Sequence, residues 1–360
     1  MVAKDEASTE IDRPRRNRPL LPRRRSRTRS ASRSENALGW IFTGPVVFGL
    51  ILFVAIPILL TVWVSFRDWN GFVSPFDTPY IGFENYSKLL FEAGIRQTDF
   101  ARSIRNNFYY VIGVVPMQTT LALVIAVILN KTALKGKGFF RTAYYFPSIT
   151  SSIAVTLIFV FMFQTQGAIN AVLPFGNINW LDNANGLIHN ALGVIGVHQP
   201  PAWAAGIEFM GLTLWDWFAG PSVAMFAIMM LVTWTTTGTM MLIFLAGLQS
   251  IPPSVEEAAT VDGAGPFQMF WRVTIPMMRP TIYFVVMLGL IGTWQVFDQI
   301  FATNFGGPRK TTITPAFWIY FQSFRNSEAG LGAAIAILLF GVIMIFAFLQ
   351  RCIIKSSGEL

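Results

Sequence analysis

The sequence has little with which to build a catalytic or metal site. It contains a single cysteine, Cys352, and two histidines, His189 and His198, among 360 residues. One cysteine excludes a disulfide within the chain and a cysteine-rich metal site, and two isolated histidines offer little for histidine-based catalysis. The phosphate-cradling sequence Gly-x-x-x-x-Gly-Lys-Ser/Thr does not occur, so the chain lacks this device for hydrolysing ATP. We therefore expect no catalytic residue, no metal ligand and no cofactor bound by this chain.

Charged residues are also scarce. Asp, Glu, Lys and Arg make up 13% of the chain, whereas 53% of the residues are hydrophobic. A soluble domain carries about 25% charged residues. The composition therefore predicts an all-α membrane protein that crosses the bilayer several times.

About six apolar segments are long enough to cross a bilayer. They are residues 38–66, 108–129, 142–163, 222–248, 281–303 and 330–349. Four basic residues crowd the short loop from Lys131 to Arg141, whereas residues 164–221 contain no Lys or Arg. By the positive-inside rule this pattern predicts that both termini are cytoplasmic. A transmembrane domain over residues 38–355 would then have outer loops at 67–105 and 164–221.

One stretch of the outer loop, Pro201–Ala219, is apolar enough to pass for a further span. A crossing there would bury Glu208 and Asp216 in the bilayer, at several kcal/mol. We therefore interpret it as an interfacial helix or as part of a folded outer subdomain.

Residues 1–37 form a separate basic region. Ten arginines lie there among Ser and Pro: Arg13, Arg15, Arg16, Arg18, Arg23, Arg24, Arg25, Arg27, Arg29 and Arg33. Such a composition predicts a disordered cytoplasmic tail that contacts anionic lipids. Nucleic acid is a less favoured partner, because no aromatic residue interrupts the arginines and a span follows directly.

A polar segment, residues 251–280, separates two of the apolar segments. Ser254 and Glu257 have the spacing of a capping box, which predicts the start of a helix. Gly263 is expected to end that helix, and Pro276 to stop a second one. The segment therefore predicts a helix, a turn and a helix.

This segment carries a resemblance to a known family. Glu257-Ala258-Ala259, Gly263 and Val273-x-Ile275-Pro276 resemble the Glu-Ala-Ala loop of the membrane subunits of binding-protein-dependent ABC importers, in particular carbohydrate permeases related to the maltose transporter. The resemblance implies a type I importer permease architecture, in which this loop docks into a groove on a cytoplasmic ATPase. The coupling residues that it implies are Glu256, Glu257, Ala258, Ala259, Asp262, Gly263 and Pro276. The alternative is a hairpin that packs on its own bundle.

Polar side chains inside two spans suggest a path for a sugar. The candidates are Trp234, Thr235, Thr236, Thr239, Trp294, Gln295 and Asp298. Hydroxyls and amides can hydrogen-bond a sugar, and an indole can cover the apolar face of its ring. In the family that the chain resembles, residues shortly after a matching tryptophan contact the sugar, and they map onto Thr235, Thr236 and Thr239. Alternatively the threonines bond to their own helix and pack, and Asp298 is a structural charge or a proton-coupling site.

These features predict the permease subunit of an ATP-driven sugar importer in a prokaryotic cell membrane, forming half of the translocation pore. The implied partners are a second permease subunit, two ATPase subunits that bind ATP and Mg²⁺, an extracytoplasmic binding protein and membrane lipids. A stand-alone ion-gradient transporter remains the main alternative, and a membrane-embedded enzyme is a weaker one. Such a transporter would more often show inverted repeats and broken helices, and we find no sign of them in the sequence. The identity of the sugar and the role of residues 164–221 stay open.

Overall fold

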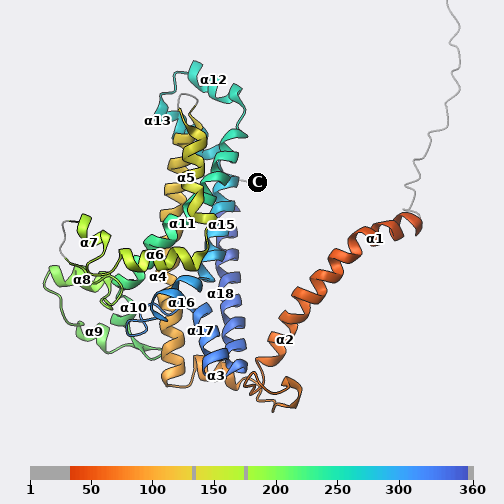
Figure 1. Cartoon of the computed structure of the whole chain (residues 1–360), viewed down its shortest axis with the longest axis vertical. Coiled ribbons are helices and arrows are strands. Elements are labelled where there is room, and N and C mark those ends of the chain that lie inside the picture. The colour runs from red at the N-terminus through yellow and green to blue at the C-terminus, as the bar shows by residue number, and fades with distance from the viewer. Residues whose placement is uncertain (1–32, 132–134, 174–176, 356–360) are drawn as a thin grey trace, which may run out of the picture. The chain divides into compact units, whose positions relative to one another are not determined.

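The computed structural model describes residues 33–131, 135–173 and 177–355, and the chain divides into two compact units, Met1–Pro57 and Ile58–Leu360 (Figure 1). The first unit contains α1 (Arg33–Leu50), the π-helical turn η1 (Ile51–Ala55) and the start of α2 (Ile56–Val64). Residues Gly39–Val64 are a continuous apolar helix, which matches the first predicted span.

The predicted basic tail lies, up to residue 32, outside the described residues. Its last residues do not fit the prediction, because α1 begins at Arg33 and therefore includes residues 33–37. The first helix therefore begins within the predicted tail.

The second unit is a helical bundle. Its long helices are α4 (Ile95–Asn130), α11 (Val223–Gln249), α15 (Arg279–Trp294) and α18 (Ala329–Lys355). The shorter helices are η2 (Pro75–Asp77), α3 (Glu84–Leu90), α5 (Lys137–Ile149), α6 (Ser152–Met162), α7 (Ala168–Val172), α8 (Leu187–Val194), α9 (Ala202–Ala205), α10 (Leu214–Trp217), α12 (Pro253–Val261), α13 (Pro266–Gln268), η3 (Met269–Thr274), α14 (Ile275–Met277), α16 (Asp298–Asn304), α17 (Pro315–Tyr320) and η4 (Phe321–Arg325). Strands β1 (Glu208–Phe209) and β2 (Leu212–Thr213) form an antiparallel hairpin in which Glu208 faces Thr213.

Helix α11 is at the centre of this bundle. More than half of its residues are buried, and it packs against α4, α5 and α15. Tyr110 and Val114 of α4 share one apolar cluster with Met225 and Met229 of α11. A Cβ at Gly238 would collide with the backbone of α5 at Tyr144, so glycine allows these helices to cross closely. The core therefore fixes the position of α11 and of the segment that follows it.

Two of the predicted spans are not straight. The segment predicted as 142–163 consists of α5 and α6, which meet at an angle of 97°. Thr150 and Ser151 leave the helical conformation at the break, and the Thr150 hydroxyl donates to the Phe146 carbonyl, 3.0 Å away. In the segment predicted as 281–303, α15 ends at Trp294 and α16 begins at Asp298. Four helices of the described residues are long and apolar enough to span a membrane alone. The number rises to six if each of two bent pairs is one span; these pairs are α5 with α6, and Pro266–Met277 with Arg279–Trp294.

The segment after α6 forms a small subdomain of short elements, in agreement with one of the two interpretations above. Asn170 organises its first part: its Nδ2 donates to the carbonyl of Ile178 at 2.7 Å, and its Oδ1 accepts from Trp180 Nε1 at 2.9 Å. Within Pro201–Ala219 the chain folds as α9, the β-hairpin and α10, rather than as one interfacial helix. Local capping explains the last turn, since Thr213 and Asp216 form a reciprocal capping box.

Candidate functional site

The segment 251–280 lies at one end of the bundle, opposite α3 (Figure 1). Helix α12 ends as predicted, because Gly263 adopts a φ of +80° and the Ala264 amide bonds back to the Ala259 carbonyl at 2.9 Å. The predicted start is wrong. Pro253 occupies the first turn and Pro252 precedes it, so Ser254 lies inside α12 and its side chain caps nothing.

The second half of the segment also differs from the prediction. Pro276 does not end the helix before it; it lies within α14, and the chain bends by 68° between Met277 and Arg279. The π-helical turn η3 precedes it, and this widened turn leaves room for a proline. The bend rather than Pro276 itself separates the segment from α15.

The base of the segment is anchored in the core. A Cβ at Gly247 would lie 2.7 Å from Thr281 Oγ1, so glycine allows the end of α11 to touch the start of α15. Met278 is fully buried there in a cluster with Phe244 and Leu248. The base of the segment is therefore packed against two helices of the bundle at once.

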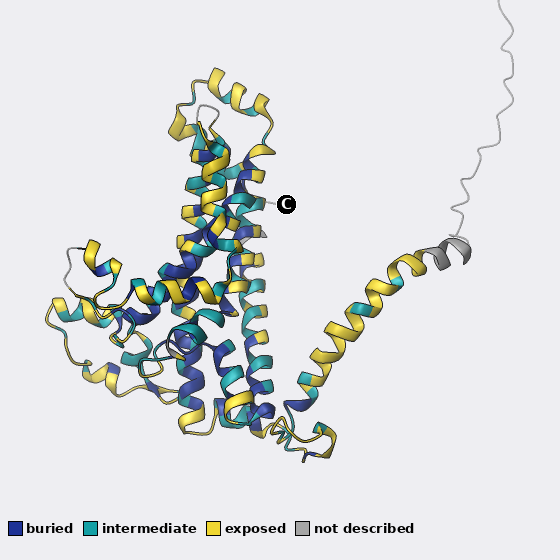
Figure 2. Ribbon diagram, in the orientation of Figure 1, coloured by how far each residue is buried: buried dark blue, intermediate teal, exposed yellow. Residues whose placement is uncertain are grey.

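Three acidic side chains of the segment are exposed to the surroundings. Glu256, Glu257 and Asp262 are exposed, and none of them forms an ion pair within the described part of the chain. Ala258 is exposed and Ala259 half-buried, and Figure 2 shows α12 open to its surroundings along its length. The hairpin therefore does not pack on its own bundle through this face.

Three large apolar side chains that sequence reasoning missed lie on the same segment. Val261, Phe267 and Trp271 are 88%, 75% and 54% exposed. Exposed apolar side chains beside unpaired acids are typical of a surface that binds another protein. The signal was present in the sequence, since a polar loop that carries Phe and Trp is unusual.

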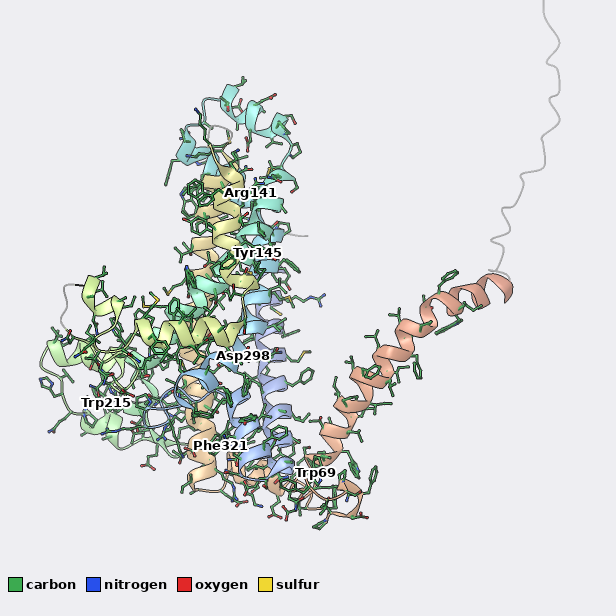
Figure 3. All side chains as sticks on the ribbon, in the orientation of Figure 1. Trp69, Arg141, Tyr145, Trp215, Asp298 and Phe321 are labelled. Atoms are coloured by element: carbon green, nitrogen blue, oxygen red, sulfur yellow. The ribbon has the colours of Figure 1, made fainter. Side chains whose placement is uncertain are left out.

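Two adjacent cavities lie at the middle of the bundle, where α11 passes the two helix breaks. One has a volume of about 250 Å³ and the other about 300 Å³, and Thr236, Met240 and Gln299 contribute to both. Thr235 and Thr239 line the second, and Gln295 and Asp298 line the first. Asp298, labelled in Figure 3, begins α16 next to the break. The structure thus brings five of the seven predicted path residues together.

The hydroxyls of this group are partly used by their own helix. Thr235 Oγ1 donates to the Val232 carbonyl at 3.0 Å, and Thr236 Oγ1 lies 2.7 Å from the same oxygen. Thr236 Oγ1 is also 2.6 Å from Gln118 Oε1 on α4, and Gln118 Nε2 is buried without a partner among the described residues. Sequence reasoning missed Gln118, because its partner is 118 residues away. Gln118 lines the first cavity together with Thr236.

The two predicted tryptophans lie elsewhere. Trp294 is 1% exposed, packs on Phe346 with ring centroids 5.2 Å apart and lines neither cavity. Trp234 lines neither cavity and packs on Phe159 at 5.3 Å. On a helix, residues that are one position apart point in different directions, which explains why Trp234 separates from Thr235.

Comparison with known proteins decides the family. Residues 118–356 match the model of the binding-protein-dependent transport system inner membrane component. The chain belongs to this family. It is 31% identical to the multiple sugar-binding transport system permease protein MsmF of Streptococcus mutans, over 87% of this chain and 93% of that protein. It is 29% identical to the lactose transport system permease protein LacF of Rhizobium radiobacter, over 89% of this chain and 95% of that protein.

A solved structure has the same fold. A chain of a bacterial ABC transporter involved in the import of the polysaccharide alginate superposes with a TM-score of 0.64 at 19% identity, over 91% of this chain and 98% of that one. The chain is therefore the membrane-embedded permease of an ABC importer, a transport component rather than an enzyme. The stand-alone transporter alternative is therefore wrong. Broken helices, of which the sequence shows no sign, do occur in the structure.

Proposed function

We propose that this permease forms half of a sugar path and is coupled by residues 251–280 to a separate ATPase, which binds ATP and Mg²⁺. A second permease subunit would complete the pore, and an extracytoplasmic binding protein would deliver the sugar. The observation that carries the coupling is the exposed surface of α12, α13 and η3, on which acids without an ion pair among the described residues lie in the same segment as Phe267 and Trp271. Such a face is costly unless a partner covers it.

The sugar assignment is supported by the cavity chemistry and by the relatives. Hydroxyls of Thr236 and Thr239 and the amides of Gln118 and Gln299 can hydrogen-bond sugar hydroxyls. The two relatives named above carry lactose and sugar in their names. Their substrates are consistent with this polar lining.

A topology with both termini in the cytoplasm is supported by the position of the basic residues. Arg141 lies on α5 at the same end of the bundle as α12 (Figure 3). The positive-inside rule and the coupling role therefore assign this end to the same compartment. In a Cys352→Ser background, His198→Cys should be labelled from outside and Glu256→Cys only after permeabilisation; labelling of position 256 in intact cells would overturn this topology.

The complex itself tests the proposed function. Tagged full-length protein should co-purify with an ATPase chain and a second permease chain when the extracted complex is analysed by mass spectrometry. Reconstituted with its binding protein, the complex should take up labelled sugar with ATP and should not take it up with an ion gradient alone. Purification of the chain without an ATPase, or uptake that needs only a gradient, would contradict the proposal.

A further inference from the structure

A second polar cavity lies away from the threonine path, between the N-terminal third of α4, the outer subdomain and the loop after α16. Its volume is about 660 Å³, within the range of about 300–1,000 Å³ for small-ligand sites. Trp215, labelled in Figure 3, lies in its wall, and His189 stacks on that indole with centroids 4.2 Å apart. The amides of Asn185 and Asn190 also line it. Aromatic surface and amides together suit a sugar.

The charge of this cavity distinguishes it from the threonine path. Three arginines line it, Arg102, Arg105 and Arg309, against one acid, Asp216. The Asp216 carboxylate is engaged locally, since its Oδ2 accepts from Thr213 Oγ1 at 2.6 Å and from the Thr213 amide at 3.1 Å. The lining therefore has an excess of positive charge.

The arginines lack full counter-charges. Arg105 is 8% exposed, and its two hydrogen bonds go to neutral oxygens, the Asp216 carbonyl at 2.9 Å and the Asn106 side-chain amide at 2.8 Å. Its Nε has no partner among the described residues. Arg102 reaches Asp99 only at 3.6 Å, and Asp99 binds Lys310 at 2.6 Å. A buried guanidinium without a carboxylate is costly, and an anion in the adjoining cavity would offset that cost.

We propose that this cavity binds the carboxylate of an acidic sugar unit on the outer side of the permease. The inference rests on the proposed function and names a substrate class for it. Arg102 and Arg105 are three residues apart on one face of α4, and Arg309 comes from the loop after α16, so the carboxylate is held between two elements. Asn185, Asn190 and Trp215 then contact the hydroxyls and the ring.

The test uses two disaccharides that differ only in their carboxylates. Digalacturonate and the matching neutral galactobiose are titrated by calorimetry into the whole complex in lipid nanodiscs, without ATP and without binding protein. The variant is Arg309→Asn, because Arg309 is exposed, makes no hydrogen bond or ion pair within the described chain and has a φ of +47°, which asparagine tolerates. The control is Arg325→Asn, which removes an exposed arginine that lies outside the cavity.

Wild type should bind the acidic sugar roughly tenfold more tightly than the neutral one, and Arg309→Asn should lose roughly that factor for the acidic sugar alone, as expected for one charge-assisted hydrogen bond. Equal binding of both sugars, or an equal loss in Arg325→Asn, would overturn the inference. If Arg309→Asn instead impairs only the ATPase stimulation by binding protein, the cavity receives an acidic side chain of that protein and the sugar assignment is wrong. If the complex imports neutral sugars with ATP and does not import acidic ones, this inference is overturned and the proposed function stands.

Discussion

Residues 251–280 and the subdomain after α6, around Trp180, satisfy their polar groups in opposite ways. In the first, Glu256, Glu257 and Asp262 are exposed and form no ion pair with any described residue, and large apolar side chains are exposed in the same segment. In the second, one buried amide, Asn170, binds the backbone and the Trp180 indole within the same subdomain. The acids of the first region have no ion-pair partner among the described residues, whereas the buried amide of the second is hydrogen-bonded within its own subdomain. Substitutions in residues 251–280 should therefore break assembly, whereas substitutions at Asn170 should break local folding.

The largest effect is expected at Glu257. In the proposed coupling a cation of the ATPase faces Glu257, so Glu257→Lys places two like charges in contact, and disruption of a close charge pair costs about 2–5 kcal/mol. Pull-down of the ATPase and its stimulation by loaded binding protein should both be lost, while the permease remains folded because the side chain is exposed. Ala258→Trp should have the same effect by steric separation.

The control is Glu92→Lys, the same charge change at an exposed acid away from the coupling segment. It should retain the ATPase. Full retention of pull-down and stimulation in Glu257→Lys would mean that this face is not the coupling surface.

A different outcome is expected when Asn170, in the subdomain around Trp180, is changed. Asn170→Ala leaves the Trp180 indole and the Ile178 carbonyl without their partner, which costs roughly 1–3 kcal/mol when such groups are buried. Hydrogen exchange of the outer subdomain should rise, while pull-down of the ATPase stays at the wild-type level. If Asn170→Ala also failed to pull down the ATPase, the prediction that this residue affects local folding alone would be wrong.

The two regions also differ in how far the sequence predicts them. The turn at Gly263 is set by the conformational freedom of one residue, and the apolar spans by composition, so local rules suffice. The breaks at residues 150–151 and 295–297 escape a hydropathy window, which averages over the two or three residues of each break. The Asn170 cluster and the contact between Gln118 and Thr236 depend on tertiary packing, and a single sequence shows neither.

A smaller effect is expected on the sugar path. Replacing Thr235, Thr236 and Thr239 together by valine keeps their shape and removes hydroxyls that line the cavities. Each lost neutral hydrogen bond costs about 0.5–1.5 kcal/mol, so KM for sugar uptake should rise at least roughly twofold while assembly is unchanged. Thr237→Val is the matched control, because that threonine is buried, bonds to the Thr233 carbonyl and lines neither cavity. Unchanged uptake kinetics in the triple variant would assign the three residues to packing.

The smallest effect is expected from the titration of His189 in the same subdomain. Burial, more than the nearby Arg105 guanidinium, lowers the pKa of His189 below its ordinary value of about 6.5, although its bond to the Trp215 carbonyl opposes this. The folded subdomain therefore binds fewer protons than the unfolded one as the pH falls through that value. By linkage, the contribution of His189 is fully present above about pH 6.5 and is lost as the pH falls towards the folded pKa.

Hydrogen exchange of the peptides around residues 187–217 checks this sign. Protection, corrected for intrinsic exchange rates, should be lower at pH 5.5 than at pH 7.5 in wild type, and the difference should shrink in His189→Phe, which keeps an aromatic ring for Trp215 but cannot titrate. The same measurement on His198→Asn separates the two histidines of this cavity. Because the coupling segment contains no histidine, its exchange should not follow this pH dependence. Protection that rises on acidification would mean that His189 gains, rather than loses, a favourable environment for its charge on folding.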